Sequence, residues 1–270
     1  MTTVANIAAT AGQTVVRERS FMIIERTITF LWQLLLCIAA SCFVAELIGY
    51  WMHRLLHSNL IPALSRNHLI HHLVLYAPNA SLRSGSYLDA TENRPAIGNV
   101  GLEWLVPSAL VLTMSWLLLR LGGVPVVFQW VSLLTMVAWP LFTFNYLHDR
   151  MHLRDFWMAR HPLFRNWFLR ARRLHDIHHR SLRDDGQMDA NFGIGFYFFD
   201  RVFRTISRRH HPLNCHGLQA AKSILWEPLA EDPSSESVEP RHRGIDDIPG
   251  DFHGEETEEV ASADRQAPRV

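Results

Sequence analysis

Three long apolar runs narrow the possible folds of this 270-residue chain more than any other feature. The first extends from Thr27 to Trp51, where Gln33 and Glu46 are the only strongly polar residues. The other two, Gly101–Leu119 and Val124–Leu147, are separated by a short link. A helix needs about 20 mainly apolar residues to cross the hydrocarbon core of a bilayer. We therefore predict an all-α integral membrane protein with about three transmembrane helices.

Two other interpretations of these runs are weaker. A buried helical hairpin in a soluble protein would also pair the second and third runs, but a chain of this length can hardly bury two more apolar segments of nearly spanning length. The first run is too long for the core of a signal peptide and no small-residue cleavage site follows it, so we expect it to be retained. Residues 155–170 mix aromatic residues with arginines, which suits an interfacial, half-inserted segment.

Positive charge predicts how the chain crosses the membrane. Arginines follow the first span and are dense after the third, between Arg150 and Arg183, whereas the link between the second and third spans contains only Arg120. Loops rich in lysine and arginine stay in the cytoplasm. We therefore expect both arginine-rich segments to face the cytoplasm and the N-terminus to lie outside.

Composition divides the chain into three expected segments. Residues 1–26 form a polar N-terminal segment, and residues 27–226 form a membrane-embedded domain. Residues 227–270 are polar, acidic and poor in large apolar side chains, so they bury too little surface to offset the entropy of ordering, and we expect them to be disordered. The three cysteines offer no disulfide framework, which fits a reduced, cytoplasm-facing site.

The same pair of histidine motifs follows the first span and the third. Each pair consists of an HX3H motif and then an HX2HH motif. Residues three or four apart on a helix lie on one face, so each motif could supply half of a metal site. The first pair comprises His53 and His57, then His68, His71 and His72; the second comprises His148 and His152, then His175, His178 and His179. We expect the two pairs to converge.

The repetition of these motifs indicates metal binding more strongly than any single motif does. A lone HX3H near a span end is usually an interfacial or hydrogen-bonding pair. A metal transporter would place its ligands along the middle of its spans, whereas these motifs lie at the span ends and beyond. Imidazole suits iron, zinc and copper, so ligand type alone does not identify the metal. A catalytically silent protein with a structural zinc site therefore remains an alternative.

The order and spacing of the four motifs resemble the fatty acid hydroxylase and sterol desaturase superfamily of integral membrane histidine-box di-iron enzymes. The segment from Asn191 to Thr205 is similar to that superfamily's "N-aromatic-G … DRLFGT" ending, although Arg204 stands where glycine is usual. The resemblance covers residues 45–206. It implies a cytoplasmic helical cap in which two iron ions, replaceable by zinc in isolated protein, use O2 to hydroxylate or desaturate an unactivated C–H bond of a lipid. By position, the implied ligands are His53, His57, His68, His71, His72, His148, His152, His175, His178 and His179.

Several polar residues are candidates for orienting these ligands. Glu46 shares a helical stripe with Tyr50, His53 and His57, and Asn145 shares one with His148 and His152. A ligating imidazole usually donates its second N–H to a carboxylate, carbonyl or water, and an ionisable group within a span suggests a function. Glu46 could instead pair with another helix. Further candidates are Asp149 and Asp176, inside the motifs, and Asn191 in the family-like ending.

The loop after the second motif bears on the substrate. Many superfamily members that act on sterols have a His-Pro pair here, and this chain does not, which argues against a sterol. The loop contains Tyr87, Asp89, Glu92 and Arg94, which could bind a charged or zwitterionic head group. An acyl chain and a polar-lipid head group both remain candidates for the oxidised part.

Electrons must come from another protein. The sequence contains no ferredoxin-like cysteine run and no glycine-rich dinucleotide fingerprint. We expect a separate electron donor, a ferredoxin-type or cytochrome-type reductase chain, and no nucleic-acid partner. The arginines between Arg154 and Arg183 could attract such a donor or contact anionic lipid head groups. Monooxygenase-type hydroxylation is favoured only slightly over desaturation, because both begin with the same hydrogen abstraction.

Overall fold

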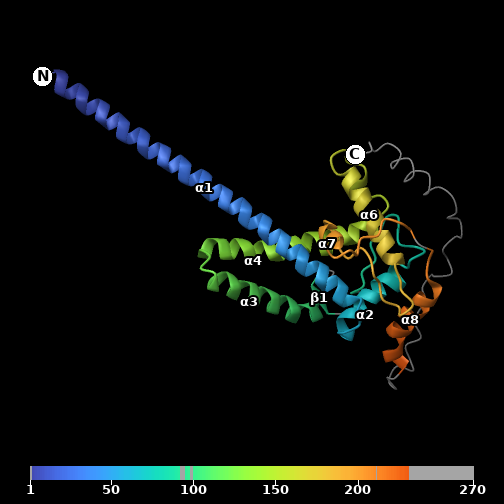
Figure 1. Cartoon of the computed structure of the whole chain (residues 1–270). Coiled ribbons are helices and arrows are strands. Elements are labelled where there is room, and N and C mark those ends of the chain that lie inside the picture. The colour runs from blue at the N-terminus through green and yellow to red at the C-terminus, as the bar shows by residue number, and fades with distance from the viewer. Residues whose placement is uncertain (1, 92–94, 98–99, 211, 231–270) are drawn as a thin grey trace. The chain divides into compact units, whose positions relative to one another are not determined.

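The structure is a computed structural model of the whole chain, and it describes residues 2–91, 95–97, 100–210 and 212–230. Two residues of the candidate substrate loop, Glu92 and Arg94, lie outside the described residues, as does almost all of the expected acidic tail. The fold is mostly helical, as predicted (Figure 1).

Among the described residues, three helical stretches are long and apolar enough to span a membrane, which is the number predicted. They are Phe21–Leu56, Leu102–Leu121 and Val126–Met151. The first belongs to α1 (Thr2–Leu56), which continues without a break through the expected boundary after residue 26. Large apolar side chains such as Leu36 and Leu118 are exposed on these stretches. Contiguous exposed apolar surface is rare in soluble proteins and suits lipid contact.

The second and third stretches form the expected hairpin. They contain α3 (Leu105–Leu121) and α4 (Val126–Pro140), which lie side by side in Figure 1. Gly123 in the connecting turn has a φ of 67°, a conformation that glycine adopts without steric cost. The helix α4 also packs along α1, where the Phe30 and Phe128 rings are 5.7 Å apart. The hairpin is thereby fixed against the first span.

The third spanning stretch is not a regular α-helix throughout. Pro140 has no N–H to donate to the preceding turn, and a π-helical segment η3 (Leu141–Leu147) follows it directly. The chain then returns to α-geometry in α5 (His148–Met151). A second π-helical segment, η1 (His71–Leu75), follows α2 (Pro62–Ile70). Such segments occur often at functional sites, and both lie within or beside histidine motifs.

The remaining described elements range from two-residue strands to helices of 16 residues. The strands β1 (Ala96–Ile97) and β2 (Val100–Gly101) pair antiparallel and lead into a 3₁₀ turn, η2 (Leu102–Trp104). A second 3₁₀ turn, η4 (Trp157–Ala159), precedes α6 (Arg165–Arg180). The last two helices of the part that the structure describes are α7 (Phe198–Val202) and α8 (Cys215–Ala230).

Two buried apolar clusters support the histidine-bearing elements. The helix α6 is amphipathic, and its buried face presents both apolar side chains and histidines. The first cluster comprises Leu147, Met151, Phe156, Met158, Phe168, Ala171, Leu174, Ile177, Ile194 and Tyr197. The second comprises Tyr50, Leu69, Leu73, Leu182, Met188, Phe192, Phe199, Ala221 and Leu225. Because histidines and core side chains alternate on the same helices, packing of the core fixes the histidine side chains.

Candidate metal centre

All ten histidines of the two motif pairs come together, as the sequence analysis predicted. They form three overlapping groups, and within each group the candidate ligand nitrogens lie within 4.8 Å of one another. Group one is His53, His57, His68, His72 and His178; group two is His71, His148, His152 and His175; group three is His71, His72 and His179. Group one joins four histidines of the first motif pair with His178 of α6, so the two motif pairs meet in one group.

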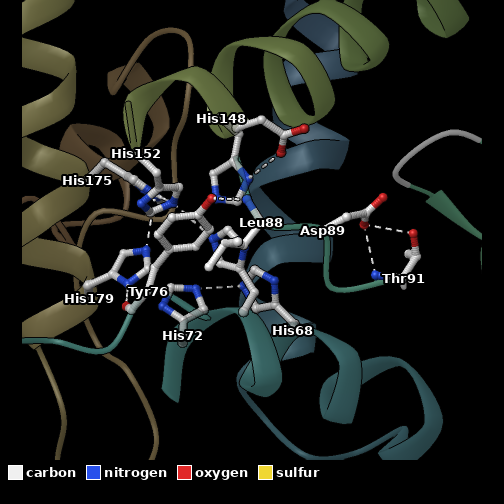
Figure 2. A network of polar contacts seen from close by, with 12 residues as sticks. His68, His72, Tyr76, Leu88, Asp89, Thr91, His148, His152, His175 and His179 are labelled. Carbon is white, nitrogen blue, oxygen red and sulfur yellow. Dashed lines mark hydrogen bonds and ion pairs between the residues drawn. The ribbon is translucent and has the colours of Figure 1, made fainter. Parts of the chain in front are cut away.

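The ring nitrogens face one another at close range. In group one, the Nε2 atom of His57 lies 3.1 Å from that of His178 and 3.0 Å from that of His68. In group two, the Nε2 atom of His152 lies 3.0 Å from that of His71 and 3.1 Å from that of His175. Figure 2 labels six of the ten histidines and shows the Tyr76 ring stacked on His152.

Backbone carbonyls determine the tautomer of four of these histidines. Because a carbonyl oxygen only accepts, the Nδ1 atom that faces it must carry the hydrogen, and the Nε2 atom of a neutral ring then has a free lone pair. The four Nδ1 atoms donate to the carbonyls of Phe192 (from His53, 2.6 Å), Ala190 (from His178, 2.7 Å), Ser81 (from His152, 2.9 Å) and Tyr76 (from His179, 2.9 Å).

Burial favours the neutral form of the histidines that lie outside the spanning stretches. Among those outside the spanning stretches, burial lowers the pKa of His152 to about 3. Burial also lowers the pKa of His57, His68, His71, His72, His175, His178 and His179 well below the usual 6.5, and neighbouring imidazoles add to this effect. Neutral imidazole is the form that binds a metal ion.

The arrangement of the nitrogens fits a bound cation. Lone pairs of neutral rings that face one another repel, and hydrogen bonds between rings cannot satisfy a whole cluster because each neutral ring has one N–H. The Nε2 atoms of His53 and His148 are buried and form no hydrogen bond among the residues described. A metal ion would use these lone pairs directly. Iron, zinc and copper all accept imidazole ligands.

Asn191 anchors the loop that supplies two of the four carbonyls. Its backbone is left-handed, with a φ of 58°, and its Nδ2 atom donates to the carbonyls of Leu174 and Ser207, both at 2.9 Å. Its Oδ1 atom accepts from the Ser207 N–H at 2.8 Å. The flanking residues Ala190 and Phe192 present their carbonyls to His178 and His53.

The other candidate orienting residues differ in what they contact. Glu46 accepts a hydrogen bond from the Trp139 indole at 3.0 Å, which corresponds to the alternative of pairing with another helix. Asp149 lies beside its neighbour His148, with 3.9 Å between carboxylate and Nδ1. Asp176 accepts from the Ser81 hydroxyl and also lies 3.6 Å from Arg180.

A cavity of about 440 Å³ reaches the histidines from between the spans. One wall follows α4 and its continuation from Met136 to His148, a length of about 18 Å at about 1.5 Å per residue. The other apolar walls come from α1 and α3, while Tyr87 and Asp89 of the candidate substrate loop lie at the polar side. Asn145 lines the cavity as well. The histidines in its wall are His53, His68, His71 and His148.

Sequence reasoning missed several residues that contact and orient these histidines. The Tyr76 ring stacks on His152 with centroids 3.9 Å apart, and the Tyr76 hydroxyl accepts the Leu88 N–H at 2.8 Å (Figure 2). Ser81 offers its carbonyl to His152 and its hydroxyl to Asp176. Neither residue belongs to a motif. Their position a few residues after HX2HH was the only available signal.

Comparison with known proteins identifies the family. A family model described as fatty acid hydroxylase matches residues 38–205. No curated protein and no solved structure gives a significant match. The matched region is more than half of the chain and contains all ten histidines as well as Asn191 and Tyr76. The chain therefore belongs to the fatty acid hydroxylase family.

Proposed function

We propose that this protein is a membrane-bound, O2-dependent di-iron oxidoreductase that hydroxylates a C–H bond of a lipid. The observation that carries the proposal is a cluster of ten imidazoles, four of which line an apolar cavity that runs along the spans. The membrane-embedded domain, residues 27–226, would carry the whole reaction.

Groups one and two would hold one iron ion each, and His179 would complete the set beside His71 and His72. Bound iron would supply what side chains lack, the reductive splitting of O2 with two electrons and two protons, in which one oxygen atom enters a C–H bond and the other leaves as water. The chain's own residues keep the imidazoles neutral, exclude bulk water and hold the substrate chain in the cavity.

The cavity also suggests how a lipid would bind. Its apolar walls on α1, α3 and α4 suit an acyl chain, and the polar residues near the histidines suit a head group. We propose that Tyr87 and Asp89, together with Glu92 and Arg94, contact that head group. The centre would face the cytoplasm, where a ferredoxin-type or cytochrome-type donor delivers the electrons.

Two alternatives predict different changes in the membrane lipids. Desaturation in the same cavity would remove two hydrogens instead of adding oxygen. A silent protein with structural zinc would leave every lipid unchanged.

The test is mass spectrometry of total membrane lipids from cells that make the wild type, His178→Ala or His216→Ala. His216 is exposed and outside the three groups, so it is the matched control. We expect a lipid with one added oxygen in the wild type and in His216→Ala, but not in His178→Ala. Loss of two hydrogens would identify a desaturase. Identical lipid profiles in all three strains, with purified protein that binds zinc and no iron, would contradict the proposal.

A further inference from the structure

His53 and Asp200 lie at opposite ends of one planar peptide unit. The His53 Nδ1–H donates to the Phe192 carbonyl at 2.6 Å, and the Gly193 N–H of the same peptide donates to the Asp200 Oδ2 at 2.8 Å. In a trans peptide the C=O and the N–H are coplanar and point in opposite directions. The carboxylate, the peptide and the imidazole therefore form one continuous hydrogen-bonded chain.

Asp200 is placed to hold this peptide rather than to face solvent. Its side chain is fully buried. Its Oδ1 accepts from the Phe192 N–H at 2.7 Å and from the Thr205 hydroxyl at 2.8 Å. Two successive N–H groups thus point at the same carboxylate. Hydrogen bonds to an ionised acceptor are roughly twice as strong as neutral ones, so the loop is held firmly.

Gly193 is necessary for this close approach. A Cβ atom at position 193 would lie 2.6 Å from the Asp200 Oδ2, closer than atoms in contact can come. Any larger residue would push the carboxylate away from the N–H. The glycine and the aspartate therefore act as a pair.

His178 has a similar hydrogen-bonded chain, but that chain ends on a neutral backbone carbonyl. Its Nδ1–H donates to the Ala190 carbonyl, and the Asn191 N–H of that peptide donates to the Thr205 carbonyl at 2.9 Å. The two histidines are alike in geometry and differ in what stands behind the peptide. Of these two chains, only the one behind His53 ends on a carboxylate.

We propose that Asp200 is a positioning residue that acts on His53 through the Phe192–Gly193 peptide. Metal-ligating histidines commonly donate their second N–H to a carboxylate, which fixes the ring and raises its basicity. Here a peptide unit stands between the two groups, and the carboxylate polarises the peptide so that its carbonyl becomes a better acceptor. The proposal rests on the proposed function, since it requires that His53 is a metal ligand.

Metal binding by purified full-length protein tests the proposal without measuring activity. The first variant is Asp200→Asn, which removes the negative charge and places an NH2 group, which cannot accept a hydrogen bond, opposite one of the two backbone N–H groups. The second variant is Gly193→Ala, which displaces the carboxylate. Bound iron is counted per chain, its affinity is measured by competition with a chelator, and Mössbauer spectra report the environment of each iron. We expect both variants to bind one of the two irons about 10–100-fold more weakly than the wild type and to keep the other.

Two further variants separate positioning from general stability. Thr205→Val removes another hydrogen bond of the same carboxylate and leaves both peptide N–H groups in place, so it should keep both irons. Asp155→Asn makes the same chemical change at an exposed site and should also keep both. Unchanged iron affinity in Asp200→Asn, or equal weakening in Asp200→Asn and Thr205→Val, would overturn the proposal. A wild type that binds no iron would instead overturn the proposed function.

Discussion

Arg204 adopts a left-handed backbone conformation that arginine disfavours. Its φ is 59°, and its side chain is exposed. For an L-residue this conformation costs roughly 1–2 kcal/mol, whereas glycine adopts it freely. The family resemblance has glycine at this position, and the structure supplies the reason, since the chain turns here after α7. The exposed guanidinium offers no hydrogen bond or ion pair among the contacts described that would explain the arginine.

Replacing Arg204 with glycine should stabilise the protein. We expect Arg204→Gly to raise the free energy of unfolding by roughly 0.5–1 kcal/mol, because relief of strain exceeds the added entropy of the unfolded chain. For a chain of this size that is a rise in Tm of about 2 °C, measurable by thermal denaturation in detergent. Arg201→Gly is the control, because Arg201 lies in the helix α7 and its replacement should destabilise by a similar amount. A lower Tm for Arg204→Gly would contradict this explanation.

At the scale of elements, α7 and the residues before it lie beside the spans rather than beyond their ends. The Phe198 ring is 5.5 Å from Phe43 of α1, and the Phe196 ring is 5.8 Å from Trp139 of α4. Phe43 and Trp139 each precede the expected end of their span by eight residues, or about 12 Å of helix. Phe196, Phe198 and Val202 are nevertheless 52%, 47% and 53% exposed. We expect this exposed apolar face to contact lipid.

Spin labels can measure the depth of this segment. In a variant whose three cysteines are replaced, labels at Phe198→Cys and Val202→Cys should collide more with oxygen than with a water-soluble nickel complex, because oxygen concentrates in the hydrocarbon. Ser84→Cys, at an exposed polar loop, is the control. If the labels at positions 198 and 202 meet the nickel complex as often as the label at Ser84, α7 lies in water. The sequence favoured residues 155–170 as the interfacial segment, and α7 would be a second one.

At the scale of the whole molecule, the sequence predicted which side chains come together, but not which backbone groups orient them. The repeated spacing from His53 to His179 predicted that ten imidazoles converge, because helical spacing and hydropathy are encoded locally. The carbonyls of Ser81, Tyr76, Ala190 and Phe192, which orient those imidazoles, carry no such signal, since every residue has a carbonyl. Only the folded chain determines which carbonyl meets which ring.

For a similar reason, the sequence could not predict the cavity or the contact that Glu46 makes. The sequence shows that the spans are apolar, but the space between α1, α3 and α4 depends on how their side chains interlock. Glu46 shares a helical face with His53, which suggested a role near the metal. Its partner is Trp139 on another helix, and the sequence offers no means of choosing between these two contacts.

The central claim is that the ten histidines hold iron that inserts oxygen from O2 into a lipid. The most direct measurement supplies purified, iron-loaded protein in a membrane-lipid extract with a reduced ferredoxin-type donor and isotopically heavy oxygen gas. We predict one heavy oxygen atom in a single class of lipid, and none when His178→Ala replaces the wild type. A product whose added oxygen comes from water, or one that forms equally with His178→Ala, would contradict the account.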